Sequence, residues 1–149
     1  LCCCSGMRCP QEKSPVVLTG SVSAANAKDQ IYSEVLYTLR QLGVGGKWFK
    51  ADDNKRQIFI PSLNARLLAM SSDGKRQMGL NSVFTLLDEG AYHVNSSLYD
   101  AVANAHVGRK NGMLMSISTS GMDATSWYHG LYKKAKRILS GEDTDPQTY

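Results

Sequence analysis

The sequence predicts an α/β fold with a mainly parallel sheet flanked by helices, and three observations predict it. Short apolar runs typical of strands alternate along the chain with segments that have the three- and four-residue spacing of amphipathic helices. The run at residues 83–87 is almost continuously apolar, as expected of a parallel strand buried on both faces. Before it, two apolar segments around a polar turn indicate an inserted β-hairpin at about residues 47–70.

Residues 1–7 favour the last turns of a helix, and residues 16–19 favour a short buried strand led in by Pro15. The next segment predicts a helix that Ser21 or Ser23 caps and Gly43 ends. Its apolar residues recur at helical spacing: Ala24, Ala27, Ile31, Val35, Leu39 and Leu42.

Strands are then expected at residues 47–50, 57–61 and 65–70, with a polar turn at 52–55. Trp48 and Trp127 are expected to pack in the hairpin or the core. The second half predicts a helix at 96–106, a strand at 112–118 and a helix at 124–140 that Gly141 ends. The predicted inward positions are Leu98, Ala101, Val102 and Ala105 on the first helix, Trp127, Leu131, Ala135 and Ile138 on the last, and Met113, Met115 and Ile117 as possible core residues of the strand.

Composition sets the class of protein. The chain has 149 residues, 42% of them hydrophobic and 20% charged, which is typical of one globular domain and excludes a disordered chain. The net charge of +4 is compatible with nucleic acid, although charge alone favours an ordinary solvated surface. No apolar run is long enough for a membrane span, and no signal peptide is recognisable.

All four cysteines, Cys2, Cys3, Cys4 and Cys9, lie within the first nine residues, and the three histidines are scattered singly. Metal sites usually show paired cysteine or histidine ligands at separated positions. We therefore interpret Cys2–Cys4 as packed helix residues rather than as metal ligands or disulfide partners, in a reducing compartment.

The apolar run 83–87 leads directly into two adjacent carboxylates, Asp88 and Glu89. Ligands of open α/β sheets bind outside the carboxyl ends of the strands, so both side chains are expected at a ligand site. Carboxylates at this place are the Walker B pattern of P-loop ATPases. The other interpretation is a buried strand followed by a solvated turn.

Flanking motifs support the catalytic interpretation. A Ser-x-Asp segment and a Gly-Leu-Asn segment precede the strand within residues 70–82, and Ser118-Thr-Ser-Gly121 ends the next predicted strand. In order and spacing, over about residues 1–145, these motifs resemble the large terminase subunit of tailed bacteriophages, the ATPase that pumps DNA into empty capsids. The chain does not contain the phosphate loop G-x-x-x-x-G-K-[ST], and the nearest match, Gly43–Lys47, has the wrong spacing.

The resemblance implies a P-loop NTPase-type sheet that binds ATP and Mg²⁺ in the intact protein. Asp88 would reach Mg²⁺ through water and Glu89 would orient the attacking water. The hydroxyl turn Ser118, Thr119, Ser120 and Gly121 would sense the γ-phosphate and couple hydrolysis to movement; the alternative is a generic turn with a capping serine. Arg76 is the preferred arginine finger for a neighbouring subunit, ahead of Lys75 and Arg66.

The resemblance also implies the assembly. Residues 1–141 would be a partial ATPase domain, inactive without its phosphate loop, and residues 142–149 would begin a linker toward a nuclease domain. The implied partners are double-stranded DNA, a homo-oligomeric ring, the portal protein and the small terminase subunit, in the host cytoplasm and without a membrane. The basic residues 133–137 on the last helix either touch DNA phosphates or form a solvated helix face.

Two alternatives remain open from the sequence. One is a helicase-like nucleic-acid ATPase, because the Asp88–His93 segment is similar to an Asp-Glu-x-x-His strand end with one extra position. The other is a decayed, non-catalytic domain that keeps the fold and binds protein partners.

Overall fold

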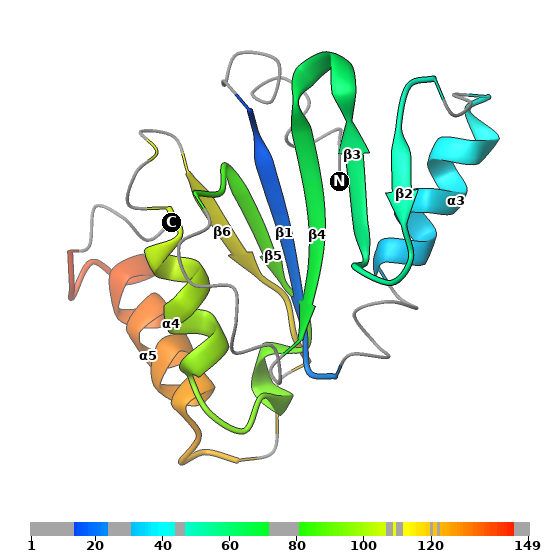
Figure 1. Ribbon diagram of the computed structural model, residues 1–149. Helices are drawn as coiled ribbons and strands as arrows, with labels where there is room; N and C mark the ends of the chain where they lie inside the picture. Colours follow the sequence, from blue (N-terminus) through cyan, green and yellow to red (C-terminus); the bar gives the residue numbers. More distant parts are fainter. Residues whose placement is uncertain are drawn as a thin grey trace.

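The computed structural model describes residues 14–23, 31–43, 47–71, 81–106, 109, 112–119, 121 and 123–144 (Figure 1). Within them, one six-stranded sheet has the order β2-β3-β4-β1-β5-β6. Strands β4, β1, β5 and β6 pair in parallel, whereas β2-β3 and β3-β4 pair antiparallel. The strands are β1 (Val16–Ser21), β2 (Lys50–Asp52), β3 (Gln57–Ile60), β4 (Ala65–Ser71), β5 (Phe84–Leu87) and β6 (Met113–Ser116). The predicted α/β class, with its mainly parallel sheet and inserted hairpin, is confirmed.

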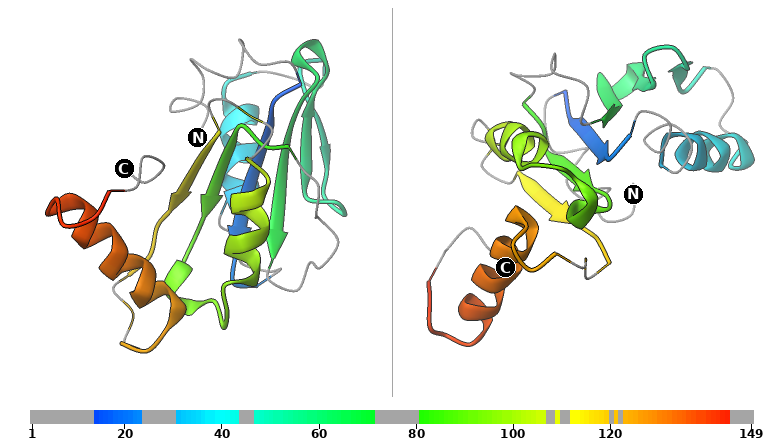
Figure 2. Two further views of the ribbon diagram at one scale, coloured as in Figure 1. Left: turned by 90° about the vertical axis from the view of Figure 1, so that its left-hand side faces the viewer. Right: turned by 90° about the horizontal axis from the view of Figure 1, so that it is seen from below.

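Helices cover both faces of the sheet. Helix α3 (Ser33–Gln41) and helix α4 (Ser97–Asn104) lie on opposite sides of it, and α5 (Trp127–Leu139) lies beyond β6 (Figure 2). Side chains of adjacent strand residues point to opposite faces, so β1 contributes to both cores. On one face Leu18, Met70 and Leu87 pack against Leu98 and Val102 of α4. The opposite core includes Tyr32, Leu36, Phe49, Ile58 and Ala69.

The first described helix begins later than its predicted cap. A π-type turn at residues 31–32 leads into α3, and residues 24–30 lie outside the described part of the chain. Gly43, with φ of +66°, follows the last turn, so the predicted end is confirmed. Leu42 was expected on the apolar face but is 70% exposed, because the chain leaves helical geometry at this residue.

The hairpin has the predicted strands with a shifted start. Its first strand begins at Lys50 rather than residue 47, because Lys47 and Trp48 lie in a turn. Phe49 is buried, while Trp48 is 62% exposed, so the predicted packing of Trp48 was wrong. A short 3-10 helix, η3 (Pro61–Leu63), joins β3 to β4 and was not predicted.

The three residues in and after β6 that were predicted as possible core are exposed. Met113, Met115 and Ile117 are 40%, 41% and 45% exposed. Leu114, which alternates with them, packs in the core beneath α4. The exposed side chains lie on the same face of the sheet as α3. Among the described residues, α3 packs over other strands of that face and does not cover β6.

Helix α5 runs from Trp127 to Leu139, inside the predicted range. Ser126 caps its start by accepting a hydrogen bond from the His129 amide at 3.2 Å. None of its residues is fully buried, although the predicted inward positions are half-buried. Within the described part of the chain, no helix is both long and apolar enough to cross a membrane.

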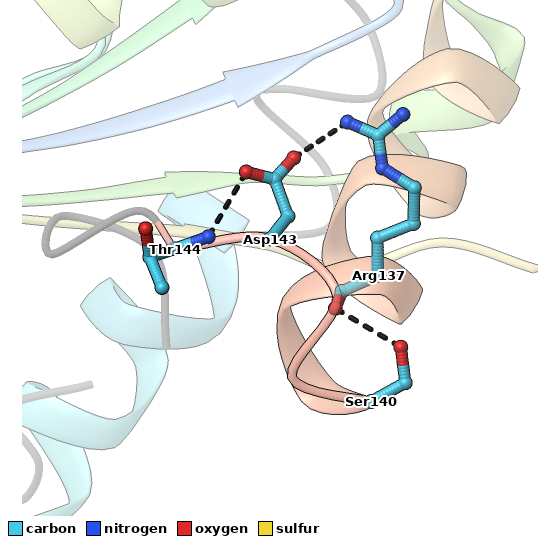
Figure 3. Close-up of polar contacts among 4 residues, drawn as sticks. All are labelled: Arg137, Ser140, Asp143 and Thr144. Atoms are coloured by element: carbon cyan, nitrogen blue, oxygen red, sulfur yellow. Dashed lines mark hydrogen bonds and ion pairs between the residues drawn. The ribbon is translucent and has the colours of Figure 1, made fainter.

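Arg137, one of the basic residues of α5, has a structural role at the end of the helix. The Arg137 carbonyl accepts from the Glu142 amide and the Gly141 amide donates to Ile138, which is a Schellman motif with Gly141 at φ of +78°. The predicted stop at Gly141 is therefore confirmed. The Arg137 guanidinium is paired with the Asp143 carboxylate at 2.5 Å (Figure 3). This contact lowers the pKa of the Asp143 carboxyl below its usual value.

Candidate functional site

Asp88 and Glu89 lie where the sequence predicts them, at the carboxyl end of a central parallel strand. Leu87, the last residue of β5, is level with Gly20 of β1 and Ser116 of β6. The Asp88 amide donates to the Gly20 carbonyl at 2.8 Å, which holds the first carboxylate residue against β1. Both residues are half-buried. This is the edge of an open α/β sheet at which ligands bind.

Glu89 has an unusual backbone. Its φ of 52° and ψ of 44° place it in the left-handed region, which costs a residue with a Cβ about 1–3 kcal/mol in general. The surrounding contacts must therefore impose this conformation. Its Oε2 is buried and has no hydrogen-bond partner in the described part of the chain. A buried carboxylate oxygen with spare acceptor capacity is suited to hold a water molecule or a metal-bound water.

The residue after Glu89 must be glycine. Gly90 begins the 3-10 helix η4 (Gly90–Tyr92) and is buried. A Cβ at this position would lie 2.3 Å from Cε2 of Tyr128 and 2.8 Å from the Ser116 hydroxyl. The chain therefore turns away from β5 by passing directly over the end of β6 and the first turn of α5.

The second predicted motif meets the first in space. The Ala91 amide donates to the Ser118 hydroxyl at 3.0 Å, and the Gly90 amide donates to the Ile117 carbonyl at 3.2 Å. Thr119 donates to the Tyr92 hydroxyl at 3.4 Å. Gly121, with φ of +64°, approaches Ala91 so closely that an added Cβ would lie 2.9 Å from the Ala91 Cβ. Ser118, Thr119 and Gly121 thus line the Asp88–Glu89 turn, while Ser120 lies outside the described residues.

The sequence did not predict two residues that support the Asp88–Glu89 turn, His93 and Trp127. His93 is buried, and its Nε2 donates to the Asp88 carbonyl at 3.1 Å, which requires the proton on Nε2. The Trp127 indole donates to the His93 carbonyl at 3.0 Å. The predicted core packing of Trp127 is confirmed, since it also packs in the core beneath α4. The glycine and histidine in Asp-Glu-Gly-Ala-Tyr-His were visible signals, but the role of Trp127 needed the fold.

The predicted basic residues are not gathered here. Arg76 and Lys75 lie outside the described residues. Arg66 is level with Val16, at the amino end of the parallel strands, and its guanidinium stands over the Phe59 ring at 5.7 Å. Cys2–Cys4 and Cys9 also lie outside the described part of the chain.

Among the described residues, Asp88 and Glu89 are the carboxylates of the candidate site. In the part of the chain that the structure describes, no group of three or more His, Cys, Asp or Glu side chains could hold a metal ion. Mg²⁺ in proteins usually keeps several waters and binds through one or two carboxylates together with substrate phosphates. One strand-end carboxylate, Asp88, fits that mode, because the phosphates would supply the remaining oxygens.

Comparisons with known proteins show a similar fold in a solved structure. No protein-family model matches the chain, and a search of curated proteins finds no match either. Among solved structures, the crystal structure of the HK97 bacteriophage large terminase is similar at a TM-score of 0.74, with 18% sequence identity. The match covers 90% of this chain and 28% of that chain, so this chain spans well under a third of the protein it resembles. The predicted resemblance is thereby confirmed in fold: this chain has the α/β fold of a segment of a phage large terminase.

Proposed function

We propose that this chain is part of the ATP-hydrolysing motor of a phage terminase large subunit, which moves double-stranded DNA into the procapsid. Two independent lines support the proposal. The sequence carries strand-end carboxylates and a hydroxyl turn in the order of that family, and the fold is similar to the HK97 large terminase.

The observation that carries the proposal is the hydrogen bond between Ser118 and Ala91. It joins the segment after β6 to the turn that bears Asp88 and Glu89. A generic strand-end turn has no need of a second hydroxyl-rich segment held against it. In a motor, such a link would transmit a change at the carboxylates to the next strand and to α5.

The roles of the two carboxylates follow from their chemistry. In the proposal, Asp88 accepts hydrogen bonds from the water shell of Mg²⁺, which would neutralise charge on the phosphates. Glu89 accepts a hydrogen bond from the attacking water and so aims it at the terminal phosphorus. Ser118 holds the backbone that follows Glu89, and Thr119, which donates to the Tyr92 hydroxyl, is exposed and so available for sensing the γ-phosphate region.

Further parts of the proposal rest on the family resemblance. They are a phosphate-binding loop and a nuclease domain outside residues 1–149, Arg76 as a trans-acting finger, and a linker from residue 142. The proposed assembly is a homo-oligomeric ring on the portal protein, with a small terminase partner, in the host cytoplasm. The isolated chain should bind ATP weakly, because no phosphate loop occurs in its sequence.

The test is ATP turnover, with and without double-stranded DNA, in the polypeptide that carries this chain together with a phosphate loop. Glu89→Gln should keep Mg-ATP binding and lower turnover by about 10²–10⁴-fold, the usual contribution of one general base. Glu142→Gln, which changes an exposed carboxylate beyond α5, is the matched control and should retain turnover. A wild-type rate of ATP hydrolysis in Glu89→Gln would contradict the catalytic role of Glu89. An ATP turnover rate that does not change when double-stranded DNA is added would contradict the proposed motor function.

A further inference from the structure

Three buried side-chain atoms have no hydrogen-bond partner in the described part of the chain: Thr19 Oγ1, Ser21 Oγ and Glu89 Oε2. Thr19 and Ser21 are 1% and 0% exposed. Thr19 and Ser21 belong to β1 and Glu89 follows β5, its neighbour in the sheet. Buried polar groups are almost always paired, so three unpaired atoms on β1 and just beyond β5 call for an explanation.

The register places Ser21 beside the proposed site. Gly20 is level with Leu87, so Ser21 is level with Asp88. Val17 and Phe84 are paired and belong to the same core, and side chains alternate between faces along each strand. Thr19 and Ser21 therefore lie on the face of Val17, and the strand alternation puts Asp88 on that face too. The two hydroxyls form a short column that ends level with the first carboxylate.

Packing alone does not explain this column. An unpaired buried hydroxyl is unfavourable, and an apolar residue of similar size would avoid its desolvation. Valine for threonine and alanine for serine would suit the middle of a strand flanked by Leu86 and Ala69. A buried water molecule typically makes about three hydrogen bonds to otherwise unpaired polar groups. The Ser21 hydroxyl, at the level of Asp88, and the Glu89 carboxylate oxygen are two unpaired groups at this end of the strands.

We propose that Ser21 is a positioning residue of the Asp88–Glu89 site. Its hydroxyl binds a water molecule shared with the Glu89 carboxylate and thereby fixes the direction in which that carboxylate accepts from the attacking water. Ser21 itself does not touch the substrate. The inference rests on the proposed ATPase function and adds a residue that neither the motifs nor the fold comparison assigns.

The test compares Ser21→Ala with Ser21→Thr in the same phosphate-loop-bearing polypeptide. Ser21→Ala should lower kcat about tenfold, the factor that one ordinary hydrogen bond is worth, and change KM for ATP less than twofold. Its melting temperature should change little, because the Ser21 hydroxyl makes no hydrogen bond to another protein group in the described part of the chain. Ser21→Thr keeps the hydroxyl and should recover most of the kcat.

Thr85→Val is the matched control. Thr85 is a buried hydroxyl residue of β5 that lies on the opposite face of the sheet from Asp88 and is paired with Ser82, and its replacement should leave kcat unchanged. A lower kcat together with a lower melting temperature in Ser21→Ala would indicate a structural role and overturn the inference. Wild-type kcat in Ser21→Ala, while Glu89→Gln is inactive, would overturn it and leave the proposed function standing. Absence of Glu89-dependent turnover in the unmodified protein would overturn the proposed function, and the inference with it.

Discussion

The Ser118 hydroxyl accepts a hydrogen bond from the Ala91 amide at 3.0 Å, across 27 positions of sequence. Ser118 follows β6, and Ala91 lies two residues beyond Glu89 in the turn after β5. The backbone bond from Gly90 to Ile117 runs parallel to it. The strained turn at Glu89 is therefore held by the segment that follows β6. A displacement of either segment should move the other.

Replacing Ser118 by alanine removes the acceptor and leaves the half-buried Ala91 amide unpaired. We expect the free energy of unfolding to fall by about 1 kcal/mol. Turnover of the phosphate-loop-bearing polypeptide should fall as well, because Glu89 loses part of its support. Chemical denaturation and an ATP turnover assay measure the two effects. Ser62→Ala, an exposed serine in η3, should change neither, and an equal loss there would deny Ser118 a specific role.

The local parts of this site could be predicted from the sequence, but its contacts could not. Asp88 and Glu89 follow an uninterrupted apolar run, so their place at a strand end needs only local pattern. The contact between Ser118 and Ala91 depends on β5 and β6 being neighbours in a set register, which no short-range pattern encodes. The exposure of Met113 and Met115 likewise depends on which part of the sheet a helix covers. The prediction for Trp48 was wrong for a local reason, because the neighbouring Phe49 is the residue that is buried.

Two glycines should respond in opposite ways to alanine. At Gly90, the new Cβ would lie 2.3 Å from a ring carbon of Tyr128, so Gly90→Ala should destabilise the fold by about 1–3 kcal/mol. Gly130 lies inside α5 with nothing within 4 Å of an added Cβ. Gly130→Ala should therefore stabilise the fold by about 0.5–1 kcal/mol, since glycine is unfavourable within a helix. Thermal or urea unfolding of both variants measures the contrast.

A double-mutant cycle assigns the cause of the Gly90 effect. Tyr128→Ala alone loses packing, but it removes the ring that the new Cβ would meet. The combined variant should therefore be more stable than the sum of the two single losses predicts. Simple additivity would mean that the backbone of the turn, rather than the contact with Tyr128, makes glycine necessary.

Tyr32 should couple the start of α3 to the hairpin. Its hydroxyl donates to the Asp53 carboxylate at 2.8 Å while its ring is 1% exposed. Tyr32→Phe should lower the free energy of unfolding by about 1 kcal/mol. Burial, together with the hydrogen bond to Asp53, raises the pKa of Tyr32 above its ordinary value. The folded state therefore keeps a proton that the unfolded state loses, so stability should fall as the pH rises above about 10.

The loss of stability at alkaline pH is the measurement that identifies the role of the Tyr32 hydroxyl. In Tyr32→Phe, the part of the decline that this hydroxyl causes should vanish, so the two proteins converge in stability at high pH. Asp53→Ala should reproduce most of the loss at neutral pH and make the second substitution nearly silent. Parallel pH curves for the wild type and Tyr32→Phe would rule out this hydroxyl as the titrating group.

Stability should also depend on pH through His106, at the amino edge of the sheet. Its Nδ1 donates to the Ser82 carbonyl at 3.1 Å. Burial lowers the pKa of His106 below its ordinary value, and the Ser82 bond only partly opposes this. The folded state therefore binds fewer protons than the unfolded state, and the free energy of unfolding should fall as the pH drops below about 6.5. Urea unfolding measured between about pH 7.5 and about pH 5 covers this window.

The pH range of the loss distinguishes the contribution of His106 from those of Asp123 and Asp143. Hydrogen bonds from Thr125 lower the pKa of Asp123, and Arg137 lowers that of Asp143, so their stabilising contributions are lost only below about pH 4. His106→Asn removes the titrating ring but keeps an amide able to donate toward Ser82. It should be less stable than the wild type at neutral pH and should lose the part of the slope that His106 causes. If its stability falls between about pH 6.5 and 5 as steeply as that of the wild type, the buried imidazole is not the group that titrates there.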